Sequence, residues 1–339
     1  MHAVEIRTVD ILDDAAVAAW HASKLSTLRH DREDPVFWSL REVIMGLRDS
    51  NAPRRTVLLT AHDGDAVVGA GSMSLPLRDN RTLSEVDVQV EPGHRRQGIG
   101  GALFDRLRTT AVDDHRTSVI AAIVGHYDGT PVPPGVPFAE SFGLTFRNEE
   151  VRRRVRLPIP SDRLHELLES TVDRRNGYRL ESWEGPCPDD YADQYAALIP
   201  LLSIEAPAGD LEFEPEQYDV KRLRDGEALW AAQGLRVFTT IALAADGAIV
   251  GHTQLAVPDD DADKAHQWAT LVLREHRGHR LGLALKAQNH LVVQKALPDL
   301  DRTIHTWNAR QNRWMISVNE QLGYRPVDTF MEYQGDLKV

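Results

Sequence analysis

The sequence predicts an α+β protein built from two tandem domains, each a mixed, mostly antiparallel sheet flanked by helices. Three observations support this prediction. The chain has 339 residues, which suits two domains of ordinary size. Strand and helix patterns follow one another in mixed order along each half, as in α+β folds. The order of predicted strands, turns and helices in the first half also recurs in the second half, which indicates that one supersecondary unit occurs twice.

The repeat is clearest in a β-hairpin predicted for each half. Two β-type runs separated by an Asp-Gly pair lead to Gly69, and the same pattern leads to Gly251. Asp-Gly is typical of a tight hairpin turn. Gly69 and Gly251 lie 182 positions apart, and so do His94 and His276 after the next predicted strand. This constant separation indicates two copies of one fold.

The boundary between the copies is predicted near residue 160. The proline-rich segment Leu157-Pro158-Ile159-Pro160 interrupts the regular secondary structure predicted on either side of it. Three leucines then fall on one face of a predicted connecting helix over 161–175. We therefore expect an N-terminal domain over 1–160, and a linker helix with the C-terminal domain over 161–339.

Composition and charge narrow the classes of partner. Asp and Glu number 51 against 39 Lys and Arg, a net charge of −12 that disfavours nucleic acid and anionic membranes. No stretch of 18 apolar residues occurs, and residues 1–7 lack the apolar run of a signal peptide. The single Cys187 fits a reducing compartment. We expect a cytoplasmic protein with no nucleic-acid partner, no membrane partner and no metal site.

A glycine-rich basic turn follows the third long strand predicted in the first half. The strand ends at Val90, the turn begins at Gly93, and a helix begins near Ile99. The glycine spacing fits neither the dinucleotide-binding fingerprint nor the P-loop. Glycine lets backbone approach a ligand closely, and the free N–H groups of a helix's first turn hold a phosphate oxyanion. The sequence therefore predicts phosphate binding at this turn.

The turn resembles motif A of the GNAT acyltransferase superfamily, whose Arg/Gln-x-x-Gly-x-Gly/Ala pattern is met by Arg95, Gly98 and Gly100. In that family the turn holds the pyrophosphate of acetyl-CoA. The resemblance recurs in the second half from Arg277, with Arg280 in the place of Gly98, and an arginine there is still able to contact a phosphate. Two GNAT-like domains in one chain also resemble the layout of the mycothiol synthases, but no motif carries over their substrate.

A second family motif separates the halves. Residues 312–324 resemble the GNAT segment Asn-x-x-Ala-x-x-x-Tyr-x-x-x-Gly-Phe, with Asn312 in the asparagine place. The resemblance implies that Asn308 or Asn312 meets the pantetheine arm of CoA, although Asn312 also fits a helix cap. The first half has Val132 at the matching place, inside a Pro/Gly loop. We therefore expect a complete cofactor groove in the C-terminal domain and a degenerate one in the N-terminal domain.

The resemblance implies acetyl-CoA, or another short acyl-CoA, as the cofactor, with contacts along both turns. In the first half the implied contacts are Val90, Arg95, Arg96, Gln97, Gly98, Ile99, Gly100 and Gly101. In the second half they are Val272, Leu273, Arg277, Gly278, His279, Arg280, Leu281, Gly282, Leu283, Asn308 and Asn312.

Acyl transfer to an amine requires a base, hydrogen bonds to the developing oxyanion and, ideally, an acid for the leaving thiolate. The resemblance implies that backbone N–H groups of the motif-A strands, near Val90 and Val272, donate hydrogen bonds to this oxyanion. The family's usual tyrosine acid lies four residues before the glycine of the second motif, where this chain has Ala139 and Asn319. A different acid, or a thiolate that leaves unaided, is therefore expected.

Candidate bases differ between the halves. The first half offers Glu85 and Asp87 on its motif-A strand, whereas the second offers only His266 and Gln267 before the corresponding strand. His266 would act through its near-neutral pKa, or is simply solvated. The catalytic candidates are thus His266, Gln267 and Asn319, with Glu85 and Asp87 if the N-terminal domain is active.

Acidic loops in the second half suggest the class of acceptor. A loop between its first two predicted helices carries Glu205, Asp210 and Glu212, and a further acidic run occupies 259–263. In the GNAT arrangement both loops border the acceptor groove, where carboxylates attract a cationic amine. We expect Glu205, Asp210 and Glu212 to bind the substrate, unless these runs are solvated turns.

These features predict an acetyl-CoA-dependent N-acetyltransferase acting on the primary amine of a small molecule, such as an aminosugar, an aminoglycoside-like compound, a polyamine or an amino-acid derivative. Chemistry is expected in the C-terminal domain, and the protein is expected to be a monomer or a homodimer. One alternative is a catalytically silent GNAT pair that binds acyl-CoA as a sensor or scaffold. Another is catalysis in the N-terminal domain.

Overall fold

The structure is a computed structural model that describes residues 4–32 and 34–337. In the first half, the elements follow one another as the repeat predicts. They are β1 (Glu5–Thr8), α1 (Asp14–Asp31), α2 (Leu40–Arg48), β2 (Arg54–Asp63), β3 (Ala66–Pro76), β4 (Leu83–Val90), the 3₁₀ turn η1 (Pro92–His94), α3 (Ile99–Asp113), β5 (Ser118–His126), α4 (Gly135–Ser141) and β6 (Thr145–Arg156).

The second half repeats this order after a linker helix. Its elements are α5 (Ser161–Glu169), β7 (Arg179–Glu184), α6 (Asp189–Leu198), α7 (Leu201–Glu205), α8 (Val220–Gln233), β8 (Leu235–Leu243), β9 (Ile249–Pro258), β10 (Lys264–Val272), the 3₁₀ turn η2 (Arg274–His276), α9 (Leu281–Ala296), β11 (Thr303–Ala309), α10 (Arg313–Gln321) and β12 (Arg325–Asp336). The linker helix α5 ends earlier than the sequence predicts.

Local sequence explains where several helices begin and end. The Asp13 carboxylate accepts hydrogen bonds from two N–H groups of the first turn of α1. Ser39 and Glu42 form a capping box at the start of α2, in which each side chain bonds the other residue's N–H. Asp219 caps α8 in the same way as Asp13 caps α1, and Gly234 ends α8 with a left-handed φ of 77°.

The predicted hairpins are confirmed in both halves. Strands β2 and β3 pair antiparallel, and so do β8 and β9. The register shifts by one residue after Ala61 in the first hairpin and after Ala242 in the second. Because a bulge re-aims every side chain beyond it, its presence at matching places shows that the halves share backbone detail as well as element order.

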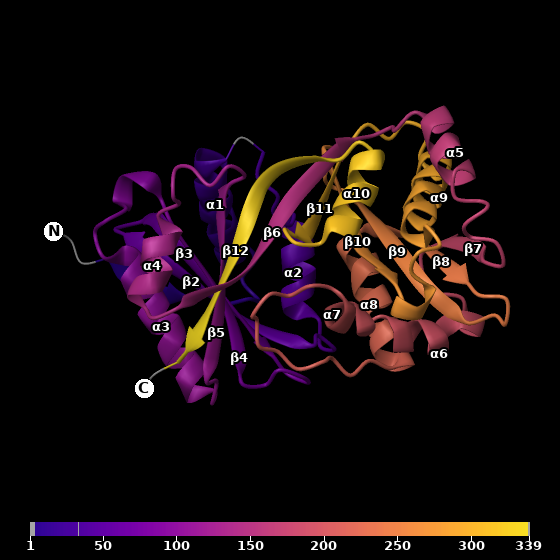
Figure 1. Ribbon diagram of the computed structural model, residues 1–339. Coiled ribbons are helices and arrows are strands. Elements are labelled where there is room, and N and C mark those ends of the chain that lie inside the picture. The colour runs from indigo at the N-terminus through magenta and orange to yellow at the C-terminus, as the bar shows by residue number, and fades with distance from the viewer. Residues whose placement is uncertain (1–3, 33, 338–339) are drawn as a thin grey trace.

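All described strands form one twelve-stranded sheet in the order β1-β2-β3-β4-β5-β12-β6-β11-β10-β9-β8-β7. The order is symmetric about its centre, where β6 and β12 pair antiparallel. Strand β12 also pairs with β5 of the first half, and β6 also pairs with β11 of the second half. Each half therefore gives its last strand to the other, and the two long strands lie side by side across the middle of the molecule (Figure 1).

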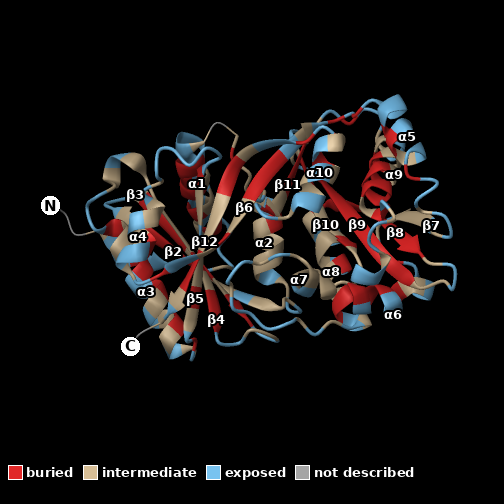
Figure 2. Cartoon of the chain, viewed as in Figure 1, coloured by how far each residue is buried: buried red, intermediate tan, exposed pale blue. Residues whose placement is uncertain are grey.

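Two layers of helices cover the sheet. We call the side covered by α1, α2, α6 and α8 the α1 face, and the side covered by α3, α4, α9 and α10 the α3 face. On the α3 face, Leu103 and Phe104 of α3 pack on β3, β4 and β5, and Leu283 of α9 packs on β9 and β11. On the α1 face, Trp20 of α1 packs on Leu58 and Ala70. The core therefore lies on both faces of the sheet, and Figure 2 shows buried residues in the strands and in the helices that cover them.

The exchange of β6 and β12 predicts that neither half folds alone. A fragment over 1–160 would lack β12, so that β5 would expose its edge and β6 would lose both of its neighbours. We expect fragments 1–160 and 161–339 to be unfolded or aggregated when expressed separately, and to form a compact complex when expressed together. Circular dichroism and size-exclusion chromatography measure this, with the full chain as control. A monomeric 1–160 fragment that unfolds cooperatively would contradict the prediction.

Candidate functional site

The two basic turns have the same backbone shape but exchange glycine and arginine. In the first turn Arg96 and Gly98 have left-handed φ values of 63° and 86°. In the second, Gly278 and Arg280 have φ values of 86° and 56° at the matching positions. Glycine adopts this conformation at little cost, whereas arginine is strained there. Each turn therefore carries one strained arginine, and the two turns keep the same conformation although glycine and arginine exchange places.

Both turns present a row of free backbone donors. In the described part of the chain, the N–H groups of residues 96–101 and of 278–283 have no hydrogen-bond acceptor. Helices α3 and α9 begin within these rows, and neither has a side-chain cap. The rows combine uncapped N–H groups with the positive end of a helix, which together bind anions such as phosphate.

The residues assigned to the cofactor differ in accessibility. Ile99, Leu281 and Leu283 are buried in the cores, so that only their backbone can reach a ligand. A Cβ added at Gly100 would lie 3.3 Å from the Phe138 ring of α4, so this glycine permits close packing of α3 and α4. The remaining positions on the turns are partly or fully exposed, namely Val90, Gln97, Gly101, Val272, Leu273 and Gly282.

The arginine that opens each turn braces it. The Nε–H group of Arg95 donates to a carbonyl at the end of β4 (2.9 Å), and its guanidinium forms two bonds to Asp31 at the end of α1 (3.0 and 2.8 Å). Arg277 repeats this pattern, with 3.1 Å to the end of β10 and 2.8 Å to Glu205 of α7. Both guanidinium groups are therefore engaged with carboxylates, and Glu205 holds the turn.

The segment after the linker helix α5 borders the second turn. The Nδ1 atom of His279 lies 2.9 Å from the carbonyl oxygen of Arg174. Arg280 donates to the carbonyl of Ser170 (3.1 Å) and to the Oε1 atom of Gln321 in α10 (3.0 Å). The Arg280 side chain thus connects the linker to α10 beside the free N–H row.

The two parallel strands next to each turn splay apart. Strands β4 and β5 pair only as far as Val86 and Ala121, although both continue for several residues. Strands β10 and β11 pair only as far as His266 and His305, and the register of β10 against β9 also shifts near 268–269. Beyond these points the strand edges facing each other carry unpaired backbone groups. Each opening can therefore accept an extended, hydrogen-bonding chain such as pantetheine.

Three polar side chains line the opening in the second half. The Nζ atom of Lys286 in α9 donates to Asn319 Oδ1 (2.5 Å), and Asn319 Nδ2 donates to Asn308 Oδ1 (2.6 Å). Burial lowers the pKa of Lys286 to about 7. The first half has Phe104 and Ala139 at the positions that match Lys286 and Asn319. The structure therefore brings Asn308 and Asn319 together, with a lysine that the sequence analysis missed.

Asn312 lies outside this group. Its side chain accepts a hydrogen bond from the Met315 N–H (3.2 Å) and caps α10. The geometry thus favours the capping role among the two that the sequence left open. Asn319, at the place of the family's tyrosine, is fully buried, and an amide supplies no proton to a leaving thiolate.

His266 and Gln267 lie within β10 rather than before the motif strand, which corrects the position expected from the sequence. Both are buried, and burial lowers the pKa of His266 to about 4. The His266 ring lies 5.4 Å from the ring of Trp38. Gln267 Nε2 donates to Thr253 Oγ1 (3.0 Å) and to the Gln254 carbonyl (2.6 Å). A histidine with this pKa is a weak base at neutral pH.

The carboxylates of β4 lie on the α1 face at the opening of the first half. Glu85 pairs with Arg54, and Asp87 lies 3.1 Å from Lys24 of α1. Both carboxylate side chains stay at least a third exposed. Each of these two carboxylates therefore keeps accessible surface beside its cationic partner.

Two further carboxylates join this face, and the sequence analysis missed both. Burial, reinforced by the charge of Glu332, raises the pKa of Glu150 to about 7. Within the described residues, no hydrogen bond or ion pair reaches the Glu150 carboxyl. Burial also raises the pKa of Glu332, which accepts a hydrogen bond from Asn148 (2.8 Å). Glu150 is on β6 and Glu332 on β12, so only the strand exchange brings them onto the same sheet face as Asp87.

The matching face of the second half is filled differently. Arg152 forms two hydrogen bonds to Asp328 (2.8 and 2.7 Å), and both side chains are largely buried. Arg152 also lies 3.3 Å from His305, whose pKa falls to about 3 through burial and this neighbouring charge. Asp34, from the α1–α2 loop of the first half, pairs with Arg154 at this place. Cations lie on the α1 face of both halves, since the first half has Arg32, 5.8 Å from the Phe330 ring, besides Lys24 and Arg54. The second half differs in that its buried carboxylate, Asp328, is paired with an arginine.

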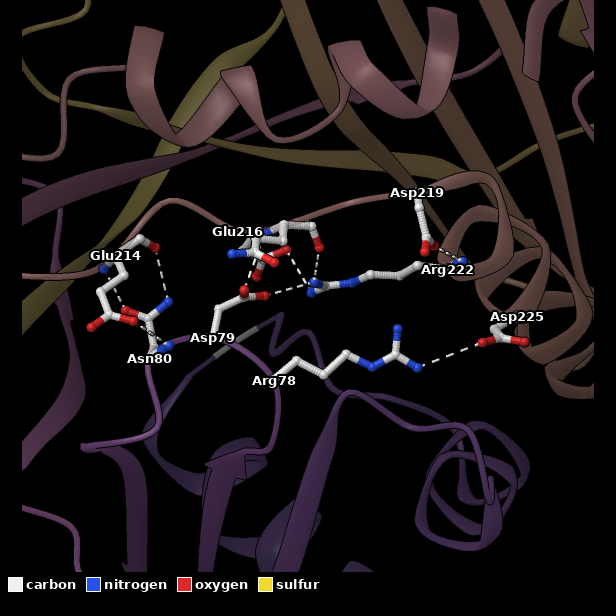
Figure 3. Close-up of polar contacts among 9 residues, drawn as sticks. Arg78, Asp79, Asn80, Glu214, Glu216, Asp219, Arg222 and Asp225 are labelled. Carbon is white, nitrogen blue, oxygen red and sulfur yellow. Dashed lines mark hydrogen bonds and ion pairs between the residues drawn. The ribbon is translucent and has the colours of Figure 1, made fainter. Parts of the chain in front are cut away.

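The acidic loop expected to bind substrate docks onto the first half (Figure 3). Asp79, in the β3–β4 loop, lies 2.7 Å from Arg222 of α8, and Glu216 lies 2.8 Å from the same guanidinium. Asn80 and Glu214 exchange three hydrogen bonds. These charges therefore hold the halves together.

The assigned residues Asp210 and Glu212 belong to the same docked loop. The Asp210 N–H donates to the carbonyl of Arg147 (2.9 Å), and the Glu212 N–H donates to Gln334 Oε1 (2.9 Å). Their backbones thus lie against β6 and β12. Substrate binding by their side chains stays a prediction. In the other acidic run, Asp261 accepts two backbone hydrogen bonds and shapes the turn before β10.

Comparison with known proteins gives the class of this fold. Residues 16–129 match the model of the acetyltransferase (GNAT) family. The chain is similar to a tandem GNAT protein from the clavulanic acid biosynthesis pathway, solved without acetyl-CoA, with 26% identity over 99% of both chains and a TM-score of 0.77. It shares its fold with a GCN5-related N-acetyltransferase from Sphaerobacter thermophilus (14% identity, 99% of this chain and 96% of that one, TM-score 0.65). No curated protein sequence matches it.

Residues 16–129 therefore carry the match to the GNAT acetyltransferase family, and the chain as a whole is similar in fold to a tandem GNAT protein. Proteins of this family transfer acyl groups and use acyl-CoA. Neither of these two structures is described as a mycothiol synthase, so that likeness stays a prediction.

Neither a membrane-spanning helix nor a metal-binding group of side chains occurs among the described residues. No described helix combines the length and apolarity needed to span a bilayer. Within the same residues, no three His, Cys, Asp or Glu side chains are grouped so as to hold a metal ion.

The Asp79–Arg222 contact allows a test of the docking. Both side chains are about 10% exposed, so Asp79→Ala removes one partner of a nearly buried cation that keeps Glu216. We expect the free energy of unfolding to fall by about 2 kcal/mol, measured by urea denaturation. The matched control is Asp301→Ala, which breaks an exposed pair with Arg156 and should cost at most about 1 kcal/mol. Equal effects of the two variants would contradict the docking role.

Proposed function

We propose that this protein transfers a short acyl group, such as acetyl, from acyl-CoA to the primary amine of a small molecule, and that the acceptor binds the carboxylates on the α1 face of the first half. The observation that carries the proposal is Glu150, a mostly buried carboxyl group without a partner in the described residues, whose pKa is raised to about 7 beside Glu332. Aminosugars, aminoglycoside-like compounds, polyamines and amino-acid derivatives carry the ammonium group that such carboxylates attract.

The strand register supports a binding position between Asp87 and Glu332. The last pair of β4 with β5 is Val86–Ala121, so Asp87 and Ala122 are the first residues beyond it, and Ala122 pairs with Glu332. Neighbouring strands lie about 4.8 Å apart, so the backbones of Asp87 and Glu332 are separated by at least about 10 Å. Between them in this row stands only the methyl group of Ala122. Glu150 lies diagonally next to Glu332, through the Phe330–Glu150 pair.

The chemistry follows from this placement. Acyl-CoA, when bound, supplies an acyl group activated as a thioester. The free N–H groups of residues 96–101 fit its pyrophosphate, and the splayed edge of β4 fits its pantetheine arm. Glu150, about half ionised near pH 7, accepts the proton that the attacking ammonium or amine must lose. Asp87 and Glu332 orient the amine from either side.

The choice of half departs from the sequence prediction. The second half has the polar opening with Asn308 and Asn319, which supports cofactor binding there. On its α1 face, however, the Asp328 carboxylate is held by two hydrogen bonds from Arg152, whereas the Glu150 carboxyl of the first half has no partner in the described residues. The first half also contains the stretch that matches the family model. These observations support the first half for acyl transfer, and the assignment to the C-terminal domain stays an untested alternative.

A catalytically silent pair that binds acyl-CoA is the second candidate, because Ala139 and Asn319 replace the family's tyrosine. Release of free CoA thiol on mixing with acetyl-CoA and a panel of amines separates the candidates.

We also propose a reducing, cytoplasmic location, because Cys187 is buried and burial raises the pKa of its thiol to about 12, which leaves it unreactive.

Substitution of Glu150 tests the proposed base. Glu150→Gln keeps the shape but accepts no proton, so kcat/KM should fall about 10²–10⁴-fold, and the rise of activity through pH 7 should disappear. The matched control is Glu149→Gln, which alters a carboxylate paired with Arg310 on the other side of the same strand and should retain activity. An unchanged pH profile in Glu150→Gln would overturn the role of Glu150.

Glu150 should also lower stability as the pH rises. Its folded pKa, about 7, exceeds the ordinary value of 4.5, so the folded state binds more protons than the unfolded state between these values. The free energy of unfolding therefore falls as the pH rises through this interval. We expect Glu150→Gln to raise Tm relative to the natural chain by an amount that grows from pH 5 to pH 8, as measured by calorimetry. A constant difference across this range would contradict the raised pKa.

A further inference from the structure

We propose that Lys286 is a positioning residue of a second acyl-CoA site, in the opening of the C-terminal half, where it orients Asn308 to donate a hydrogen bond to a carbonyl group of the bound ligand. The inference rests on the proposed function for the nature of the ligand. It concerns binding in the other half, and none of the acceptor carboxylates takes part in it.

The direction of the hydrogen bonds follows from the chemistry of the three side chains. In its protonated form the Lys286 amine only donates, so it fixes the Oδ1 atom of Asn319 as the acceptor. The Nδ2 group of Asn319 must then donate, and it does so to Asn308 Oδ1. This leaves the Nδ2 group of Asn308 as the free end of the chain. Asn308 is partly exposed, and in the described residues its Nδ2 group has no acceptor.

Lys286 is costly to keep at this position, which argues that it does more than fill space. It is 1% exposed, and its described contacts are Asn319 and the face of the Tyr324 ring, 4.7 Å away, with no carboxylate. Burying a cation without a counter-charge destabilises the folded state. The first half fills the matching position with Phe104, so the fold itself does not require a lysine.

The free end of the chain lies where a ligand enters. Asn308 is on β11, three residues beyond the last pair of β10 with β11 at His305, and therefore in the splayed part of the opening. The free N–H row of residues 278–283 begins the neighbouring helix α9, which also carries Lys286. A ligand that places phosphate on this row and extends between the strands brings its amide or thioester carbonyl toward Asn308.

The test is a calorimetric titration of the full chain with acetyl-CoA. We expect two binding events per chain. Lys286→Met removes the donor while keeping the length of the side chain, and should weaken one event about tenfold or more while leaving the other unchanged. Because the cation is unpaired, this variant should keep or raise Tm. The matched control is Lys295→Met, an exposed lysine on the same helix, which should change neither event.

A double-mutant cycle with Asn308→Ala shows whether Lys286 acts through Asn308. Each single variant should weaken the same event, and the double variant should bind no more weakly than Asn308→Ala alone. Additive losses would overturn the positioning role, as would a single binding event that Lys286→Met leaves unchanged. A lowered Tm with both events weakened would show a structural lysine instead. Turnover provides a separate readout: the proposed function fails if Glu150→Gln stays fully active, whatever Lys286→Met does.

Discussion

The pairing of β6 with β12 at the centre of the sheet is the contact on which the rest of the structure depends. Each of these strands belongs to one half by sequence and completes the sheet of the other half by hydrogen bonding. The sheet therefore runs without an edge between the halves, and the interface consists of backbone hydrogen bonds as well as docked side chains. Loops reinforce the exchange in both directions, because Asp34 of the first half reaches Arg154, and Glu214 of the second half reaches Asn80.

This exchange also composes the candidate acceptor site. Glu85 and Asp87 arrive on β4, Glu150 arrives on the strand that leaves the first half, and Glu332 arrives near the C-terminal end of the chain. Burial raises the pKa of both Glu150 and Glu332, and a neighbouring carboxylate adds to each shift: Glu332 for Glu150, and Glu85 for Glu332. A bound ammonium group would relieve the repulsion.

The two halves share their backbone conformation but differ in the side chains at several matching positions. The two turns share φ values while exchanging glycine and arginine, and their opening arginines make equivalent bonds to a preceding helix. The side chains then differ at matching places. Lys286 stands where the first half has Phe104, and the α1 face of the second half has the Arg152–Asp328 pair, whereas that of the first half has Glu150 without a partner in the described residues. The two openings therefore share a backbone conformation and offer different side chains to a ligand.

The sequence by itself determined the repeat, the hairpins, the two turns and the pairing of helices with strands, because these follow from periodicity, turn residues and spacing along the chain. Asn308 and Asn319 were named from the resemblance to the family's second motif, and their roles stay predictions. The tertiary structure decided which strand lies beside which: nothing local in residues 145–156 or 325–336 tells that each strand crosses to the other half. Glu150, Glu332 and Lys286 could not be found for that reason, since burial and the distance to a charge from a remote segment are properties of packing. The same remote packing turned the acidic loop into a docking segment and buried His266.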